Sequence, residues 1–197
     1  EARVMEYWSE AQLNSIHKML NPRSIAVVGA TERMQYGGRF LNSVLQAKYW
    51  GRIYPINPRY EELMGVRCYP TLAELPESPD LVGIIVPYDR VIPALKESAE
   101  KGAGSAVIIS AGFAERGEED RQELQVELGK LARESGVRVC GPNCLGLANV
   151  KDGIWPASGG GAGQQADYVS GPVALVSQSG ASAFRPFLQS AMDKGFG

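Results

Sequence analysis

The sequence predicts an α/β fold: a doubly wound parallel sheet followed by the start of a second α/β domain. Short apolar runs alternate with amphipathic helical patterns along residues 21–149, which is typical of parallel strands joined by right-handed crossovers. A glycine, Gly29, directly follows the first apolar run, and another apolar run with a glycine turn begins after residue 170. We expect an N-terminal helix in residues 1–20, the doubly wound domain in 21–149, a linker in 150–170 and an incomplete second domain in 171–197.

Composition and charge exclude several classes of protein. The chain has 197 residues, 44% of them hydrophobic, enough for one α/β domain and part of another. A net charge of −2 argues against a general nucleic-acid or membrane-surface role. The sequence has neither an apolar run of the roughly 18 residues that span a membrane nor a signal-peptide core. Three cysteines fit a reducing compartment better than a disulfide framework, so we expect a cytoplasmic protein.

The chain begins with a predicted helix. Ser9–Gln12 reads as a capping box, and Leu13, Ile16 and Leu20 share one helix face. This helix should pack on the edge of the domain. His17, the chain's one histidine, lies beside that face, and we expect it to have a surface or packing role.

A glycine-rich loop follows the first predicted strand. Ile25–Val28 is short and β-branched, as in a strand buried on both faces. Gly29 follows it, and Gly37–Gly38 precede a helical pattern. A strand, a glycine and a helix N-terminus together make an anion pocket, because free N–H groups and the helix dipole point into it. The same spacing also occurs in ordinary strand-to-helix turns.

The loop departs from the dinucleotide fingerprint. Ala30–Thr31 follow Gly29, where G-x-G-x-x-G would place another glycine. The fingerprint also needs an acidic residue after the second strand, whereas this chain has Asn57 and Arg59 there. An arginine at that position favours a phosphate over a free ribose diol. We therefore expect a phosphorylated nucleotide other than NAD.

The second strand should lie near the sheet edge or pair over only a short length. It is predicted at Ile53–Ile56, with Pro55 inside it and Pro58 just after, and proline cannot donate a hydrogen bond to a neighbouring strand. A crossover helix precedes it, with Leu41, Val44 and Leu45 as its apolar stripe.

Two short helices are expected next. Asn57 is a candidate cap with Pro58 in the first helical position, and Gly65 would end that helix. Thr71–Glu74 reads as a further capping box, closed by Pro76.

Three more strands follow, predicted at Asp80–Pro87, Ser105–Gly112 and, with its exit loop, Val137–Cys144. The intervening helices carry Asp89 as a cap with Val91, Leu95 and Ala99 on one face, then Leu124, Leu128 and Leu131 with Gly136 as the stop. Ligands of such sheets bind at the carboxyl ends of the strands. Five loops should therefore line one crevice: Ala30–Met34, Asn57–Arg59, Pro87–Asp89, Ser110–Phe113 and Gly141–Leu145.

The last part of the chain differs in composition. Gly159–Gly163 reads as a flexible connector; a phosphate loop is the alternative, but no Gly-Lys-Ser/Thr follows. Ser177, Ser179 and Gly180 stand where another helix should start and could hold a phosphate or simply cap the helix. A serine hydrolase is excluded, because position 177 is not the glycine of G-x-S-x-G and no histidine is near.

Two further features concern partners and metals. Phe184, Phe187, Leu188 and Ala191 give the final helix an apolar face that one strand and one helix cannot bury. We expect the chain to be a fragment of a longer protein or a subunit resting on a partner. Cys140 and Cys144, with one distant histidine, do not predict a metal site.

Taken together, the motifs resemble one family. Asn21–Thr31, Tyr54–Pro58, Ile109–Phe113 and Gly141–Gly146 are similar to the Rossmann-like CoA-binding domain of NDP-forming (ADP-forming) acyl-CoA synthetases. Val173–Gly180 is similar to the opening of that family's next, flavodoxin-like domain. The resemblance extends from about residue 18 to residue 197, and the succinyl-CoA synthetase alpha subunit is a more distant relative.

The resemblance implies an acid–thiol ligase and a division of roles around coenzyme A. The nucleotide and its phosphates would contact the first loop; Asn57, Pro58 and Arg59 would lie near adenosine and its 3′-phosphate. Val86, Pro87 and Tyr88 would flank adenine or the pantetheine arm, and Ser110–Gly112 would guide that arm. The implied residues are Gly29, Ala30, Thr31, Glu32, Arg33, Asn57, Pro58, Arg59, Val86, Pro87, Tyr88, Ser110, Ala111, Gly112, Asn143 and Cys144, with Ser177, Ser179 and Gly180 for phosphate.

The chain also departs from the family pattern. The family passes a phosphoryl group through a histidine in its second domain, whereas His17 lies far upstream. Pro186 interrupts the expected helix after Gly180. The resemblance therefore implies that the phosphohistidine, the ATP-grasp part, ATP or ADP, and Mg²⁺ belong to a further domain or partner subunit, and that the second substrate is a carboxylic acid.

Three functions remain open at this level. The first is the CoA-binding part of an acyl-CoA synthetase. The second is a non-catalytic CoA-binding module of a protein acetyltransferase or regulator. The third, an NAD-binding oxidoreductase or redox sensor, is disfavoured by the missing acid after the second strand.

Overall fold

The computed structural model of this chain describes residues 8–47, 49–158, 169–180 and 185–196. Its centre is a five-stranded sheet in the order β2-β1-β5-β6-β7, with all its paired strands parallel. The strands are β1 (Ser24–Val28), β2 (Arg52–Ile56), β5 (Leu81–Ile84), β6 (Ser105–Ile108) and β7 (Arg138–Cys140). The predicted doubly wound parallel sheet is confirmed.

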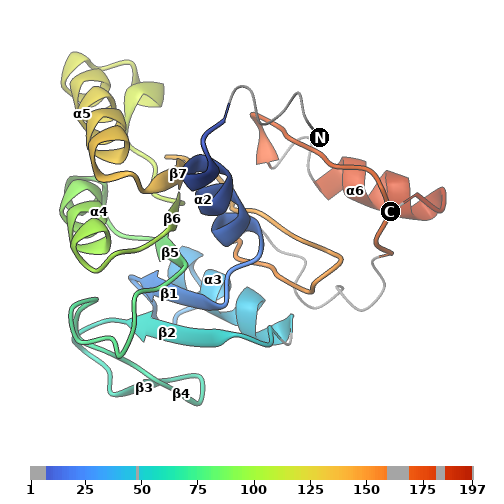
Figure 1. Ribbon diagram of the computed structural model, residues 1–197, viewed down its shortest axis with the longest axis horizontal. Coiled ribbons are helices and arrows are strands. Elements are labelled where there is room, and N and C mark those ends of the chain that lie inside the picture. Colours follow the sequence, from blue (N-terminus) through green and yellow to red (C-terminus); the bar gives the residue numbers. More distant parts are fainter. Residues whose placement is uncertain (1–7, 48, 159–168, 181–184, 197) are drawn as a thin grey trace.

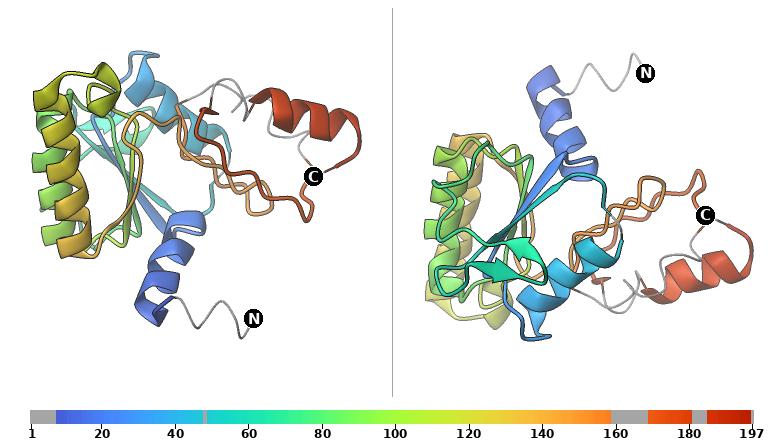
Figure 2. Two further views of the ribbon diagram at one scale, coloured as in Figure 1. Left: turned by 90° about the horizontal axis from the view of Figure 1, so that it is seen from above. Right: turned by 90° about the horizontal axis from the view of Figure 1, so that it is seen from below.

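Helices cover both faces of the sheet (Figures 1 and 2). Helices α4 (Val91–Glu100) and α5 (Glu119–Ser135) lie on one face, and α2 (Glu10–Leu20) and α3 (Tyr36–Gln46) lie on the other. Along β1, Ala26 packs in the core cluster beneath α4 and α5, while Ile25 and Val27 pack in the cluster of the opposite face. Because both faces of the strand are buried, its sequence is a continuous apolar run.

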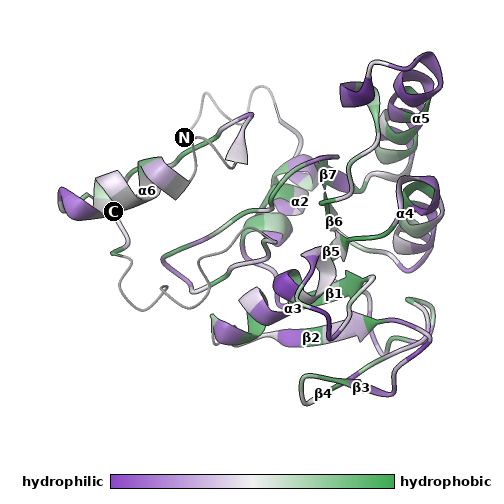
Figure 3. Ribbon diagram, turned by 180° about the vertical axis from the view of Figure 1, so that it is seen from behind, coloured by the Kyte–Doolittle hydropathy of each residue, from purple (hydrophilic) through white to green (hydrophobic). Residues whose placement is uncertain are grey.

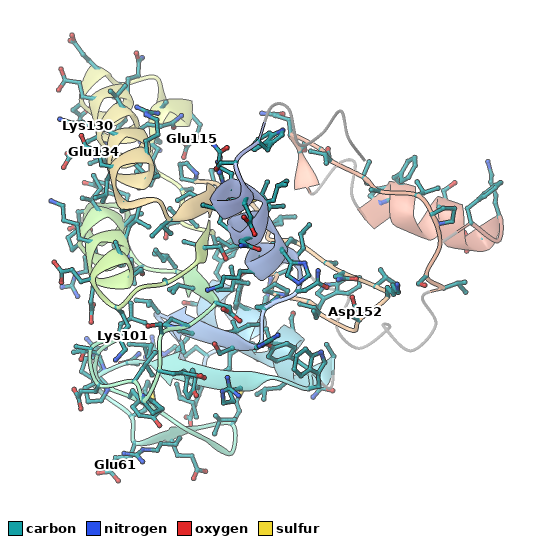
Figure 4. The ribbon with its side chains drawn as sticks, in the orientation of Figure 1. Glu61, Lys101, Glu115, Lys130, Glu134 and Asp152 are labelled. Carbon is teal, nitrogen blue, oxygen red and sulfur yellow. The ribbon has the colours of Figure 1, made fainter. Side chains whose placement is uncertain are left out.

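The outer surfaces of these helices are polar. Figure 3 shows much of α5 as hydrophilic ribbon. Its Lys130 Nζ lies 3.8 Å from Glu134 Oε1, and both side chains are exposed, as the sticks of Figure 4 show. No helix in the described part of the chain has the length and apolarity needed to cross a membrane.

The predicted capping box of α2 is confirmed. Ser9 N donates to Gln12 Oε1 at 2.8 Å, and Gln12 N donates to Ser9 Oγ at 3.2 Å. The apolar face is shifted by one residue, because Met19 is buried and Leu20 is 42% exposed. The helix rests against β6 and β7, and His17 is exposed, so the predicted surface position of this histidine is confirmed.

The second strand is an edge strand, which is one of the two alternatives predicted from its prolines, and it pairs with β1 over its full length. In the sheet, β2 pairs with β1 alone. The carbonyl of Pro55 accepts a hydrogen bond from Tyr69 N at 2.9 Å, on the side where proline's missing N–H matters least.

The helix predicted after Asn57 is wrong. The segment forms a small antiparallel hairpin of β3 (Glu62–Leu63) and β4 (Val66–Arg67). Met64 and Gly65 connect them with φ of 52° and 80°, the left-handed pair that a tight two-residue hairpin turn requires. Gly65, which was expected to end a helix, therefore turns a hairpin instead.

The capping box predicted at residues 71–74 is also wrong, because the segment forms turns instead of a helix. Side chains of α4 satisfy its backbone: Glu97 Oε1 accepts from Leu72 N at 2.7 Å, and Lys101 Nζ donates to the Leu75 carbonyl at 2.6 Å. Lys101 is labelled in Figure 4. Tertiary hydrogen bonds therefore replace the intrahelical bonds that the local pattern suggested.

The start of α4 also differs from expectation. A 3₁₀ turn, η1 (Tyr88–Arg90), precedes the helix and contains Asp89, so Asp89 is not its cap. The end of α5 is as predicted, with Gly136 at φ 74°. Leu128 is buried, and Leu124 and Leu131 pack beside it, as predicted.

Part of the segment between the two predicted domains packs on the sheet domain. Ile154 and Trp155 are buried, and Asn149 bridges to Ile154 in an antiparallel contact. Ser158 Oγ donates to the Tyr36 carbonyl at 3.0 Å. The glycine connector predicted at 159–163 lies outside the described residues.

The predicted strand after residue 170 does not form. Residues 169–177 have no helix or strand assignment, and Val176 is 98% exposed. An extended segment needs a neighbouring strand to pair its backbone groups. Helix α6 (Arg185–Asp193) follows, and Pro186 lies in its first turn, where proline is tolerated. Phe187 is 48% exposed, whereas Phe184 lies outside the described residues.

A surface ion pair at the start of β2 gives a pH-dependent expectation. Arg52 bonds Glu77 through Nε and, at 2.8 Å, through Nη2. The Arg52 hydrogen bond is the main cause that lowers the pKa of Glu77. Because the folded pKa lies below the unfolded one, the pair stabilises the fold above the unfolded pKa and this contribution is lost as pH falls through the folded pKa. Arg52→Ala should cost little stability at pH 7, because the pair is exposed, and less again at an acid pH below the ordinary pKa of glutamate.

Urea denaturation at the two pH values measures this difference. Lys130→Ala, which breaks the exposed pair on α5, is the control and should change stability negligibly. An Arg52→Ala effect of the same size at both pH values would contradict the expectation.

Candidate functional site

A cleft of about 630 Å³ opens at the carboxyl ends of β1, β5 and β6. After β1 the chain moves to β2 on one side, and it then returns to β5 on the other side. This is the point at which doubly wound sheets bind ligands, because the loops there diverge. Many predicted site residues line the cleft: Gly29, Thr31, Val86, Pro87, Ser110, Ala111, Asn143, Cys144, Ser179 and Gly180.

Two glycines let the first loop and α3 approach each other closely. Gly29 has φ 88°, and its N–H donates to the Ile56 carbonyl at 3.2 Å. A Cβ on Gly29 would overlap the Ile85 carbonyl oxygen, and a Cβ on Gly37 would overlap the Gly29 carbonyl oxygen. The glycines therefore allow a backbone cradle that no other residue fits.

The N-terminus of α3 lies at this cradle. Gln35, the N-cap residue, makes no side-chain capping bond, and Gln35, Tyr36 and Gly37 line the cleft. The first turn of a helix has N–H groups without intrahelical partners and carries the positive end of its dipole. The arrangement suits a negatively charged ligand group.

Ser110 joins the ends of two strands behind the cleft. Its Oγ donates to the Val86 carbonyl at 2.6 Å and accepts from Val86 N at 3.1 Å. The hydroxyl fixes the β5 and β6 exits relative to each other, so it shapes the cleft wall.

The loop after β7 closes over the same strand ends. Gly141 and Asn143 have φ of 109° and 52°, which glycine and asparagine tolerate best. Asn143 N donates to the Ser110 carbonyl at 2.9 Å. Cys144 Sγ lies 3.3 Å from the Ile108 carbonyl oxygen. These bonds bring Asn143 and Cys144 into the cleft wall.

The residues after β2 lie beside the cleft and do not line it. Asn57 Nδ2 donates to the Ala30 carbonyl at 2.8 Å, and Asn57 Oδ1 accepts from Arg59 N at 3.0 Å. Pro58 and Arg59 are exposed. Four of the five predicted loops thus form the cleft, and Asn57 ties the fifth to it, because the edge strand β2 lies beyond β1.

Other predicted residues occupy the loop surface and the second wall. Ala30 is buried and contributes only its carbonyl, while Glu32 and Arg33 are exposed. Ser177 Oγ donates to the Ser179 carbonyl at 2.9 Å and accepts from Ser179 N at 3.2 Å. That hydroxyl is therefore engaged in a local turn.

Tyr88 and Gly112 lie just outside the cleft lining in a charged cluster. The Arg121 guanidinium carbon lies 3.6 Å from the Tyr88 ring centroid, a cation–π stack that supports the ring. Glu115, labelled in Figure 4, accepts hydrogen bonds from Gly112 N and Phe113 N. Burial tends to raise the pKa of Glu115, but these N–H donors prevail and the pKa is lowered.

Some lining residues were not predicted. They are Gln35, Tyr36, Ile85 and Ile109. All flank predicted positions, and Gln35 and Tyr36 stand where the first crossover helix begins, which was the available signal. Arg121 was also missed, because nothing local in the sequence links it to Tyr88.

A second hollow, of about 550 Å³, lies between α2, α5 and β7. None of the predicted site residues lines it. Among the described residues there is also no group of three or more His, Cys, Asp or Glu side chains placed to hold a metal ion.

Known proteins share this sequence pattern. Residues 23–150 match the family model described as "CoA binding domain". The chain is 39% identical over 165 residues to the alpha subunit of ADP-forming acetate–CoA ligase II of Pyrococcus furiosus, covering 82% of this chain and 34% of that protein. It is 43% identical over 135 residues to a trans-feruloyl-CoA synthase from an unknown prokaryotic organism, covering 68% of this chain and 19% of that protein.

Solved structures are also similar to this chain. An acetyl-coenzyme A synthetase of Candidatus Korarchaeum cryptofilum, in complex with phosphate and ADP, superposes with a TM-score of 0.83 at 34% identity, covering 93% of this chain and 38% of that one. PH0766 of Pyrococcus horikoshii superposes with a TM-score of 0.82 at 31% identity, covering 92% of this chain and 40% of that one. The chain thus spans about a fifth to two fifths of the length of each of these four proteins.

Proposed function

Because the chain belongs to the family of CoA-binding domains carried by ADP-forming acyl-CoA synthetases, we propose that it is the CoA-binding part of such a ligase. The reaction joins a carboxylic acid to coenzyme A while ATP is converted to ADP and phosphate. The observation that carries the proposal is the cleft at the switch point of the sheet, with its glycine cradle and uncapped helix N-terminus.

We assign residues in and beside the cleft to the individual parts of coenzyme A. The first turn of α3 and Thr31 receive the pyrophosphate, because free N–H groups face it there. Arg59, exposed beyond Asn57, receives the 3′-phosphate through charge-assisted bonds. Val86, Pro87 and Tyr88 flank adenine or the pantetheine arm.

The opposite wall surrounds the thiol end. Ser110, Ala111 and Gly112 guide the pantetheine arm along the exit of β6. Asn143 and Cys144 border the place where the thiol meets the activated acid, with the Ser177–Gly180 segment facing them. The cleft lining supports the assignment of Ser110, Ala111, Asn143, Cys144, Ser179 and Gly180. The assignment of Gly112 and Ser177 rests only on the motifs that carry the family resemblance.

The rest of the ligase cycle requires other parts. His17, the chain's one histidine, is exposed on α2. We therefore propose that the phosphoryl-carrying histidine belongs to a further domain, and that ATP and Mg²⁺ bind to an ATP-grasp domain or partner subunit. The Pyrococcus furiosus relative is itself described as an alpha subunit. The three cysteines, all free, fit a cytoplasmic location.

Calorimetric titration with coenzyme A, dephospho-CoA and NAD tests the proposal. We expect coenzyme A to bind, dephospho-CoA to bind more weakly and NAD to show no heat of binding. Tight NAD binding would overturn the ligase proposal in favour of the oxidoreductase alternative.

Arg59→Glu is expected to weaken coenzyme A binding more than about tenfold, because it places a negative charge beside a dianionic 3′-phosphate. Titration of the variant with coenzyme A and dephospho-CoA measures the effect, and the loss should be confined to coenzyme A. Arg133→Glu reverses the same charge on the exposed end of α5 and should change the affinity less than about twofold. An equal loss for both ligands would remove Arg59 from the 3′-phosphate role.

A further inference from the structure

Two cysteines lie close together at the end of β7, and one of them lines the cleft. Cys140 ends β7, and Cys144 follows after the Gly141–Asn143 turn. Cys144 lines the cleft, and its Sγ lies 3.7 Å from the Cys140 carbonyl oxygen. The two side chains interact closely enough to shift each other's pKa. Both side chains are half-buried beside the same apolar cluster, so they are close together and still open to small reagents.

The contact makes the two sulfurs chemically unequal. Interaction with the Cys144 side chain lowers the pKa of Cys140 to about 7. The same interaction, together with burial, raises the pKa of Cys144. Cys140 is therefore the nucleophile of the pair near neutral pH, since the thiolate is the reactive form of cysteine.

We propose that Cys140 and Cys144 form a dithiol site that reacts with low-molecular-weight disulfides and closes to a Cys140–Cys144 disulfide. The Cys140 thiolate attacks one sulfur of the reagent; a new S–S bond forms, the reagent's S–S bond breaks and one thiolate leaves. That thiolate takes the Cys144 proton, and Cys144 attacks the Cys140 sulfur of the mixed disulfide, releasing the second thiol. Two protein thiols are oxidised, and one small disulfide is reduced to two thiols.

Formation of the Cys140–Cys144 disulfide changes the shape of the cleft. Cys144 Sγ must leave its position 3.3 Å from the Ile108 carbonyl, and the turn that carries Asn143 must move with it. Asn143 and Cys144 both line the cleft, so the oxidised protein should hold the cleft ligand more weakly. This consequence rests on the proposed coenzyme A site, whereas the thiol chemistry does not.

The first experiment treats the protein with glutathione disulfide and measures intact mass and free thiols. Wild type should lose the two thiols of the pair and keep that of Cys68, which is 5% exposed. Cys144→Ser should stop at one glutathionyl group on Cys140, because no second thiol can displace it. Cys140→Ser should react about tenfold more slowly, since its remaining thiol at Cys144 is poorly ionised. A wild-type protein that keeps both thiols, or that accumulates stable glutathionyl adducts, would overturn the proposal.

The second experiment measures the affinity of the cleft for desulfo-CoA, which lacks the thiol that would reduce the disulfide. Oxidised wild type should bind it about fivefold or more weakly than reduced protein, and a reductant should restore the affinity. Cys140→Ser, given the same treatment, should change less than about twofold. An unchanged affinity after complete oxidation would refute the effect on the cleft. Absence of desulfo-CoA binding by reduced protein would instead count against the proposed function, and thiol counting would still decide the dithiol chemistry.

Discussion

Gly29→Ala is expected to lower the free energy of unfolding by about 3 kcal/mol and to abolish coenzyme A binding. Gly29 has φ 88°, and a Cβ there would overlap the backbone carbonyl of Ile85. That carbonyl belongs to the exit of β5 and cannot rotate away, so β1 and β5 must separate at the cleft. Urea denaturation gives the stability loss, and calorimetric titration gives the binding loss.

Gly117→Ala is the matched control for this prediction. Gly117 also has a positive φ, 79°, but nothing lies within 4 Å of the Cβ that alanine would add. Its loss should be about 1 kcal/mol, the cost of the left-handed backbone alone. If Gly29→Ala loses no more than Gly117→Ala, the close approach to Ile85 has no energetic consequence.

Gly83→Ala is expected to destabilise the fold by about 2 to 3 kcal/mol. Gly83 lies in β5, and a Cβ there would come within 2.6 Å of the Phe40 ring. Phe40 on α3 is fully buried, so its ring has no free space into which to turn. The strand glycine therefore leaves room for an aromatic side chain of the helix above it. Urea denaturation of the variant measures the loss.

A double variant tests whether Gly83 and Phe40 constrain each other. Phe40→Leu alone leaves a cavity and should cost about 1 to 2 kcal/mol. When the two changes are combined, the new methyl group occupies part of that cavity, so the double variant should be more stable than the sum of the single losses predicts by at least about 1 kcal/mol. Additive losses would show that the two positions are energetically independent.

The sheet could be predicted from the sequence because its strands are buried on both faces. A continuous apolar run such as Ile25–Val28, placed between helical patterns, is typical of an inner strand of a parallel sheet. Pro55 identified the edge strand, since proline there lacks the N–H that an inner strand uses on one of its sides. The long-range order of the strands follows from these local signals together with the rule for crossovers.

The short elements could not be predicted, because contacts with residues that are remote in sequence determine their structure. The capping pattern at residues 71–74 is real, but Glu97 and Lys101 of α4 bind the backbone there. Positive φ at Gly65 serves a hairpin turn as well as a helix end, so the residue alone leaves both structures open. Val173 and its neighbours have the composition of a strand, yet the described part of the chain offers them no pairing partner.

The candidate site likewise contains residues that the local sequence predicts and residues that it does not. Gly29 and Thr31 were predictable because a strand end, a glycine and a helix start are adjacent in sequence. Asn143 and Cys144 belong to the loop predicted after the fifth strand, the family resemblance implied their roles, and both residues line the cleft. The Arg121–Tyr88 stack joins elements that are remote in sequence, so no local pattern could reveal it.

The hydrogen bond from Ser158 to the Tyr36 carbonyl has a consequence for the architecture around the cleft. Tyr36 lines the cleft, as do Gln178, Ser179 and Gly180, so the polypeptide departs from and comes back to one mouth. Ser158 and Gln178, which are remote from each other in sequence, are thus both held at this mouth by the folded domain. Loop-closure entropy grows only with the logarithm of chain length, so a change in the number of residues between these two points should have little effect on stability while both contacts hold.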